Sequence, residues 1–100
     1  MRYDKLVRDK IPDIIRQKGR IPITHVADEK EYWIKLKQKL QEEVTEFLES
    51  EAIEEIADIL EVIETIEAVK NVTKQEIQSM QSKKRDDRGG FVKKIILEES

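Results

Sequence analysis

The chain has 100 residues, a length that predicts one domain over residues 1–100. Hydrophobic residues make up 38% of it and charged residues 41%, a balance too apolar for a disordered chain and too charged for a membrane protein. No apolar run approaches the roughly 18 residues of a membrane span, so no membrane partner is expected, and the cytoplasm is the expected compartment. A net charge of −3 argues against nucleic acid as a partner.

The first expected element is a short helix over residues 11–18. Proline is tolerated in the first turn of a helix and disfavours helix in the residue before it, so Pro12 marks the start. Gly19 is a suitable residue for the end. Residues 21–26, which follow, fit either a short strand or an extended crossing.

Two long helices are expected next. Asp28 followed by Glu31 is a capping-box pattern, and it opens a helix that runs to about Glu49. Ser50 can cap a second helix that ends near Asn71. Helices joined by about one residue pack antiparallel or at a sharp angle. The central part of the chain is therefore expected to form an antiparallel helical hairpin.

The C-terminal third is expected to contain one more helix and a short strand. Thr73 opens another capping box, and the helix continues to about Arg85. After a turn at Gly89 and Gly90, residues 92–97 are the best strand candidate. The expected fold class is all-α, with a minor short β element near the C-terminus.

Each long helix carries two acids three residues apart at the edge of its apolar face: Glu43 and Glu46 on the first, Glu55 and Asp58 on the second. These edges can converge in a packed hairpin, where the carboxylates repel one another unless a cation compensates. Cysteine is absent, and oxygen ligands in this number suit Mg²⁺ or Mn²⁺. The acids can also be plain solvated surface. Three others are expected to face solvent: Glu42, Glu54 and Glu61.

Four segments resemble the MazG-like all-α nucleotide pyrophosphohydrolases, a superfamily that includes dimeric dUTPases and phosphoribosyl-ATP pyrophosphohydrolase. Residues 40–46 and 54–60 resemble its E-x-x-E … E-x-x-D signature. Residues 5–12 and 88–91 resemble the ends of a compact, phosphoribosyl-ATP pyrophosphohydrolase-like branch. The spacer from Phe47 to Glu54 is shorter than the family usually shows. Either the hairpin is unusually tight, or a partner subunit completes one acid pair.

The resemblance implies a house-cleaning type of reaction, the Mg²⁺-dependent hydrolysis of a nucleoside triphosphate or a related nucleotide. Cleavage at the α–β phosphate bond gives a monophosphate and pyrophosphate. Mg²⁺, or Mn²⁺ in its place, is then held by Glu43, Glu46, Glu55 and Asp58. One carboxylate takes the proton from the attacking water, with Glu46 the first candidate and Glu43 the second.

Candidates for substrate binding lie towards both ends of the chain. Arginine and lysine bind phosphate, a Gly-Gly pair allows close approach of a ligand, and an aromatic ring can stack on a base. The candidates are Lys5, Arg8, Lys10, Lys84, Arg88, Gly89, Gly90 and Phe91. At the C-terminal set the alternative is a turn that enters a strand, with Phe91 anchoring that turn to the core.

Self-association is expected because the hairpin has a large apolar surface. Ile59, Ile63, Ile66 and Val69, alongside Trp33, present more than short flanking elements can cover. Pairing of hairpins in a homodimer or tetramer buries this surface in a four-helix-bundle core. An alternative function of a different class is a non-catalytic helical interaction or oligomerisation module, whose acidic faces are only solvated.

Overall fold

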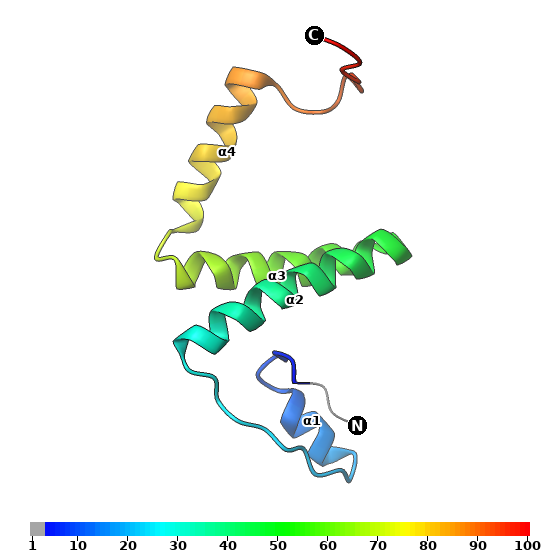
Figure 1. Cartoon of the computed structure of the whole chain (residues 1–100), viewed down its shortest axis with the longest axis vertical. Helices are drawn as coiled ribbons and strands as arrows, with labels where there is room; N and C mark the ends of the chain where they lie inside the picture. Colours follow the sequence, from blue (N-terminus) through cyan, green and yellow to red (C-terminus); the bar gives the residue numbers. More distant parts are fainter. Residues whose placement is uncertain (1–3) are drawn as a thin grey trace. The chain divides into compact units, whose positions relative to one another are not determined.

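The computed structural model describes residues 4–100 and is all-helical over that range (Figure 1), which confirms the predicted all-α class. The helices are α1 (Ile11–Gln17), α2 (Glu29–Ser50), α3 (Ile53–Val69) and α4 (Lys74–Arg88). The chain divides into two compact units, Met1–Ile63 and Glu64–Ser100. That the whole chain acts as one domain stays a prediction.

The short N-terminal helix follows its sequence signals. Pro12 lies in the first turn of α1. Gly19 has a φ of +81°, a left-handed conformation that costs other residues energy and ends the helix. Residues 21–28 lead to α2 without forming a strand (Figure 1), so the extended crossing is the alternative that the structure adopts.

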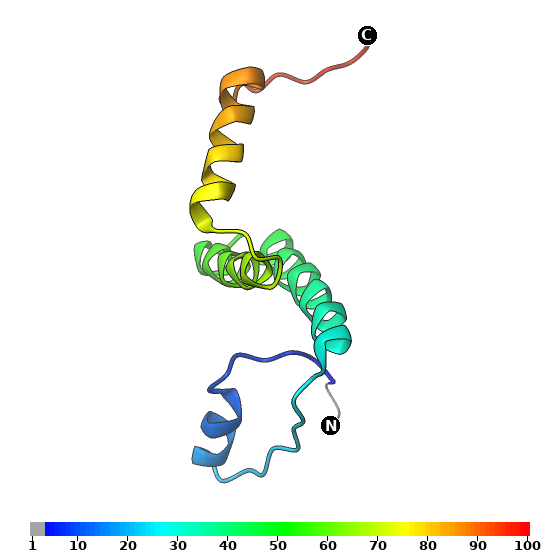
Figure 2. The ribbon, with the colours of Figure 1, turned by 90° about the vertical axis from the view of Figure 1, so that its left-hand side faces the viewer.

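Helices α2 and α3 run antiparallel and pack side by side, as two perpendicular views agree (Figures 1 and 2). The predicted cap of α2 is present, since Asp28 Oδ1 accepts a hydrogen bond from the Glu31 N–H at 2.8 Å. The link is only Glu51 and Ala52. Ser50 is the last residue of α2, and its hydroxyl accepts from the Ala52 N–H at 3.2 Å. The prediction that Ser50 caps the second helix was wrong, because Ser50 is still part of α2 and α3 begins only at Ile53.

The core of the hairpin is small. Among the described residues, the buried hydrophobic side chains are Leu36 on α2 and Val62 on α3, which are 1% and 7% exposed. Apolar side chains between 37% and 76% exposed lie on both helices: Ile34, Val44 and Leu48 on α2, and Ile53, Ile56 and Leu60 on α3. We call these six residues the open apolar face.

The predicted composition of the uncovered surface was partly wrong. Ile59, Ile63, Ile66 and Trp33 are half-buried, whereas Val69 is 41% exposed. At 100° per residue, Ile59 and Ile66 lie on the same side of α3 as the buried Val62. The open apolar face is turned away from that side.

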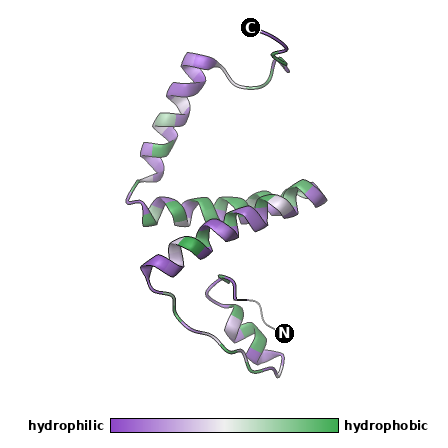
Figure 3. Cartoon of the chain, in the orientation of Figure 1, coloured by the Kyte–Doolittle hydropathy of each residue, from purple (hydrophilic) through white to green (hydrophobic). Residues whose placement is uncertain are grey.

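The second unit contains the end of α3, helix α4 and the C-terminal segment. Thr73 caps α4 as predicted, because its Oγ1 accepts a hydrogen bond from the Glu76 N–H at 3.1 Å. Figure 3 shows α4 as mostly hydrophilic. The predicted strand at residues 92–97 is absent, since residues 94–100 form no regular structure. A strand needs a partner for its backbone hydrogen bonds, and residues 4–100 offer none.

None of the helices in the described part of the chain combines the length and the apolar character that a bilayer crossing requires.

Replacing Leu36 with alanine tests whether α2–α3 packing carries the stability of the first unit. Leu36 is 1% exposed, so the change should lower the free energy of unfolding by about 2–4 kcal/mol. Urea denaturation followed by circular dichroism measures it. Leu97→Ala is the matched control, because Leu97 is 79% exposed in the C-terminal segment. A change of about 0.5 kcal/mol or less is expected there. Equal effects of the two substitutions would contradict this assignment of the core.

Candidate metal centre

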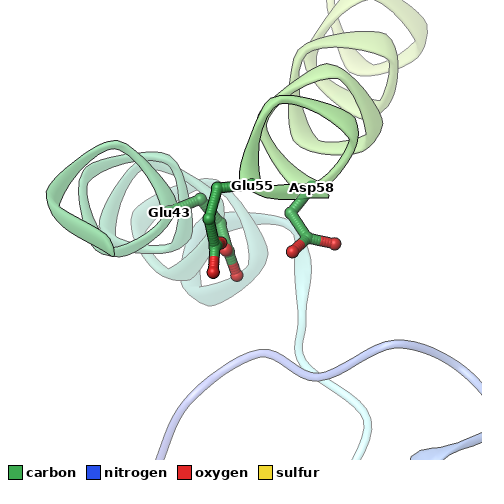
Figure 4. Close-up of side chains that lie close together, drawn as sticks. All are labelled: Glu43, Glu55 and Asp58. Carbon is green, nitrogen blue, oxygen red and sulfur yellow. The ribbon is translucent and has the colours of Figure 1, made fainter. Parts of the chain in front are cut away.

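Three of the predicted acids converge between the hairpin helices. Glu43 extends from α2, and Glu55 and Asp58 extend from α3, towards one region (Figure 4). One carboxylate oxygen from each lies within 4.8 Å of the other two. All three belong to a single chain, so the short spacer produces a tight hairpin, and these acids meet without a partner subunit.

Helix geometry explains why these acids meet. Glu43 lies seven residues after the buried Leu36, and therefore on the same side of α2, which faces α3. Glu55 has the same relation to the buried Val62 on α3. Asp58 is one turn after Glu55 and so lies on a neighbouring flank. Apolar packing of the two helices thus forces the carboxylates together.

Two carboxylate oxygens in this group are buried without a partner. They are Oε2 of Glu43 and Oε2 of Glu55. Glu43 as a whole is only 7% exposed, which is rare for a glutamate. Buried polar atoms almost always have a hydrogen-bond partner, and an unpaired one costs free energy. Two such oxygens on neighbouring acids carry a cost that a positively charged ligand would offset.

The ionisation of these acids is perturbed accordingly. Burial raises the pKa of Glu43, and the neighbouring Glu46 carboxyl raises it further, which together outweigh the lowering by Lys39. Desolvation also raises the pKa of Glu55, as do the charges of Asp58 and Glu43. A raised pKa means that the carboxyl is harder to ionise in this environment than in water. A bound cation reverses this cost.

Glu46, the fourth predicted ligand, lies next to the other acids. It is half-buried, and its carboxyl interacts with those of both Glu43 and Glu55. The converging group itself consists of Glu43, Glu55 and Asp58 within the described residues. Glu46 thus lies near Glu43 and Glu55 but is not one of the groups that converge.

Lysine side chains bind the α2 side of the cluster. Lys39 Nζ lies 3.3 Å from Glu43 Oε1 and 3.4 Å from Glu42 Oε2, and Lys5 Nζ lies 3.0 Å from Glu42 Oε1. Sequence reasoning missed Lys39, although its i,i+3 and i,i+4 spacing to the two glutamates was a usable signal.

The prediction that Glu42 faces solvent was wrong. Its side chain is only 29% exposed because lysines lie on both sides of it. Burial acts to raise the pKa of Glu42, but the hydrogen bond from Lys5 and the charge of Lys39 outweigh it and hold the pKa below its usual value. Glu54 and Glu61 are exposed, as predicted.

The α3 side of the cluster carries an arginine. Arg8 Nη2 donates a hydrogen bond to Asp58 Oδ1 at 2.9 Å. Two of the predicted phosphate-binding residues, Lys5 and Arg8, therefore lie beside the acids. Lys10, the third from this end of the chain, is exposed and precedes the first turn of α1.

The remaining predicted substrate-binding residues belong to the second unit. Lys84 and Arg88 are exposed on α4, Gly89 ends that helix with a φ of +83°, and Gly90 follows it. Phe91 is 98% exposed, so it does not anchor the turn to a core. Their roles in binding stay predictions.

The donor set suits a hard divalent cation. It consists of carboxylate oxygens, two of which lack partners. Mg²⁺ and Mn²⁺ prefer such oxygen ligands, whereas zinc sites generally use histidine and cysteine. His25, the single histidine, pairs instead with Glu31 at 2.9 Å. Glu43, Glu55 and Asp58 therefore fit Mg²⁺ chemically.

Comparison with known proteins gives one partial relative and no family. No protein-family model matches the chain, and no solved structure matches it. An uncharacterised protein of Mycolicibacterium smegmatis (strain ATCC 700084 / mc(2)155) is 50% identical over 42 residues. The matched stretch covers 42% of this chain and 43% of that protein. The similarity spans less than half of either chain.

Replacing Glu55 with glutamine should stabilise the metal-free protein at neutral pH. The raised pKa means that the folded state binds the proton more tightly than the unfolded state. Glu55 therefore contributes its full stabilisation below the pKa that it has in the unfolded state. This contribution is lost as the pH rises through the pKa that it has in the folded state. The gain in melting temperature over wild type should be larger at pH 7 than at pH 4.

Thermal unfolding in chelator at the two pH values measures this effect. Glu54→Gln is the matched control, because Glu54 is the exposed neighbour of Glu55, and it should leave the melting temperature close to that of wild type. A lower melting temperature for Glu55→Gln than for wild type at pH 7 contradicts the expected cost of this carboxylate.

Proposed function

We propose that the protein is a Mg²⁺-dependent nucleotide pyrophosphohydrolase that cleaves a nucleoside triphosphate, or a related nucleotide, at the α–β phosphate bond in the cytoplasm. The observation that carries the proposal is the pair of buried, unpartnered oxygens on Glu43 and Glu55, with Asp58 within 4.8 Å. The resemblance of the acid segments to the MazG-like enzymes supports the same reaction. The partial relative neither adds to it nor argues against it.

The arrangement favours phosphate chemistry over simple ion storage. In proteins, Mg²⁺ usually keeps several of its waters and is bound by one or two carboxylates together with substrate phosphates. A site with only three converging acids leaves coordination positions of the metal for such a substrate. Lys5 and Arg8 extend to the rim of the acid cluster and add positive charge where a polyphosphate approaches. A bound Mg²⁺ supplies charge neutralisation for the phosphate oxygens and lowers the pKa of a coordinated water.

Within this proposal, the protein orients the substrate and accepts a proton. The oxygen of a water molecule bonds to the α-phosphorus while the bond from that phosphorus to the bridging oxygen breaks, and pyrophosphate leaves with the electron pair. Glu46 is the preferred acceptor of the water's proton. It lies beside Glu43 and Glu55 but outside the converging group, so its carboxylate is less committed to the cation.

We also propose that two hairpins pair into a four-helix core. The open apolar face supports this, since Leu48, Ile56 and Leu60 are 69%, 41% and 52% exposed. On helical wheels of α2 and α3, this face and the acids lie on different sides of the buried stripe. A second copy can therefore cover the apolar side and leave the metal centre accessible.

A non-catalytic interaction module is the second candidate function. The open apolar face favours it, because contiguous apolar surface often marks a protein interface. It assigns no role to the unpartnered oxygens of Glu43 and Glu55. Metal binding therefore discriminates between the two candidates.

Titration with Mn²⁺ and an assay for pyrophosphate test the enzymatic function. At a concentration about 100 times the dissociation constant, Mn²⁺ should stabilise the fold by about 2.7 kcal/mol. With Mg²⁺, at least one member of a panel of nucleoside triphosphates and phosphoribosyl-ATP should release pyrophosphate. Glu43→Gln should reduce the rate about 100-fold or more, since changes even to residues that only support ligands cost 10–100-fold.

Glu49→Gln serves as the control for this assay, because Glu49 is an exposed acid on the same helix. It should retain both the metal response and the activity. If the wild-type protein shows neither metal binding nor a thermal shift, the enzymatic proposal is wrong and the interaction module is the remaining candidate.

Charge on the open apolar face tests the dimer. Ile56→Glu with Leu60→Glu should shift the protein from dimer to monomer in light scattering, because each substitution buries a carboxylate in the paired state. Ile23→Glu is the control, as Ile23 is 98% exposed outside the hairpin, and it should remain dimeric. A wild-type protein that is monomeric at all accessible concentrations contradicts the pairing.

A further inference from the structure

Two ion pairs between side chains connect the segment that precedes α1 to the hairpin. Lys5 binds Glu42 of α2 at 3.0 Å, and Arg8 binds Asp58 of α3 at 2.9 Å. The partners are 37 and 50 residues apart in sequence, so these contacts belong to the tertiary structure. Lys35 Nζ also donates to the backbone oxygen of Asp4 at 2.6 Å. The segment thus lies along the acid cluster.

Of these contacts, the Arg8–Asp58 ion pair involves a member of the converging group, because Asp58 is one of its three acids. Glu43 and Glu55 each keep a buried oxygen without a partner, whereas Asp58 is neutralised by the guanidinium. A bound cation would bring positive charge to all three acids. Arg8 brings positive charge to one of them, Asp58.

The Arg8–Asp58 pair can be exchanged at low cost. The two side chains are 56% and 39% exposed, and ion pairs this open to water contribute little to stability. Arg8 also precedes the first helix, in a stretch of turn and irregular backbone. A divalent cation bound beside Asp58 repels the guanidinium and competes with it for the same carboxylate.

A displaced arginine has a suitable second partner. Its planar guanidinium matches the oxygens of a phosphate group with two parallel hydrogen bonds. The substrate of the proposed reaction brings such groups to this rim. The same side chain can thus bind Asp58 before the metal enters and a phosphate afterwards.

We infer that Arg8 is an exchangeable counter-ion, which neutralises Asp58 in the metal-free protein and passes to the substrate's phosphate when the metal binds. This inference rests on the proposed function, since it needs a metal at the acids. It adds an exchange between two partners, by which the segment before α1 couples metal occupancy to phosphate capture. Arg8 then opposes metal binding and assists phosphate binding.

Opposite effects of one substitution test this inference. For full-length protein, Mn²⁺ affinity is measured by calorimetry without phosphate, and the affinity of the Mn²⁺-loaded protein for inorganic pyrophosphate is measured next. Arg8→Gln should bind Mn²⁺ about three- to fivefold more tightly, because a competing, partly exposed cation is gone. It should bind pyrophosphate about tenfold more weakly.

Two further variants provide the controls. Arg8→Lys keeps the charge but loses the fork, so its Mn²⁺ affinity should stay near wild type while its pyrophosphate affinity falls. Arg16→Gln removes an arginine that pairs with Asp13 at 2.8 Å within α1, and it should change neither affinity. Circular dichroism of each variant confirms that it is folded.

The contrary outcomes are distinct. If Arg8→Gln weakens Mn²⁺ binding, Arg8 holds Asp58 in place as a supporting residue and the exchange is overturned. If folded Arg8→Gln and Arg8→Lys both match wild type in both titrations, the pair is inert and the inference also fails. If wild type binds no Mn²⁺, the proposed function fails first, and the inference fails with it.

Discussion

The structure depends on the packing of α2 against α3, because this contact brings like charges together. Leu36 and Val62 are buried on the facing sides of the two helices. Glu43 and Glu55 follow the same helical register and so come to the same place. Apolar burial must therefore offset the repulsion between carboxylates. The opposition persists as two unpartnered oxygens and two raised pKa values. A fold that keeps such a cost is expected where the charges have a use.

Positive side chains reduce this cost without removing it. Lys39 binds Glu43 from one turn earlier on α2, and Arg8 binds Asp58 from the segment before α1. Neither reaches the buried Oε2 atoms. These two oxygens therefore stay without a positive partner, and the proposed metal would supply one. A small divalent ion suits these acids chemically, because its charge is concentrated and its preferred ligands are oxygens.

The hairpin also lacks cover for part of its apolar surface. Leu48 and Leu60 remain more than half exposed, on a side of the helices other than the one that carries the acids. The side with the acids would be stabilised by a cation, and the open apolar face would be stabilised by an apolar partner. A short chain has few residues with which to satisfy both needs internally. Metal binding and self-association are proposed for the same physical reason, which is that the hairpin leaves both demands unmet.

The sequence by itself determined the helices and the residues from which a metal centre could be built. The caps at Asp28 and Thr73 are local hydrogen bonds, so short-range pattern was enough to place the starts of α2 and α4. The i,i+3 spacing of Glu55 and Asp58 is likewise a property of one helix. Local pattern failed at residues 92–97, because a strand depends on a partner elsewhere in the chain.

Tertiary structure decided which acids meet and what binds them. Glu43 reaches Glu55 and Asp58 because a two-residue link folds α3 back onto α2, and no local pattern measures that approach. Arg8 pairs with Asp58 across 50 residues, and no local pattern indicates that partner. The Lys5–Glu42 pair likewise spans 37 residues, whereas Lys39 reaches Glu42 along its own helix. Spacing along a helix gives the face on which a side chain lies, but only packing gives its partner.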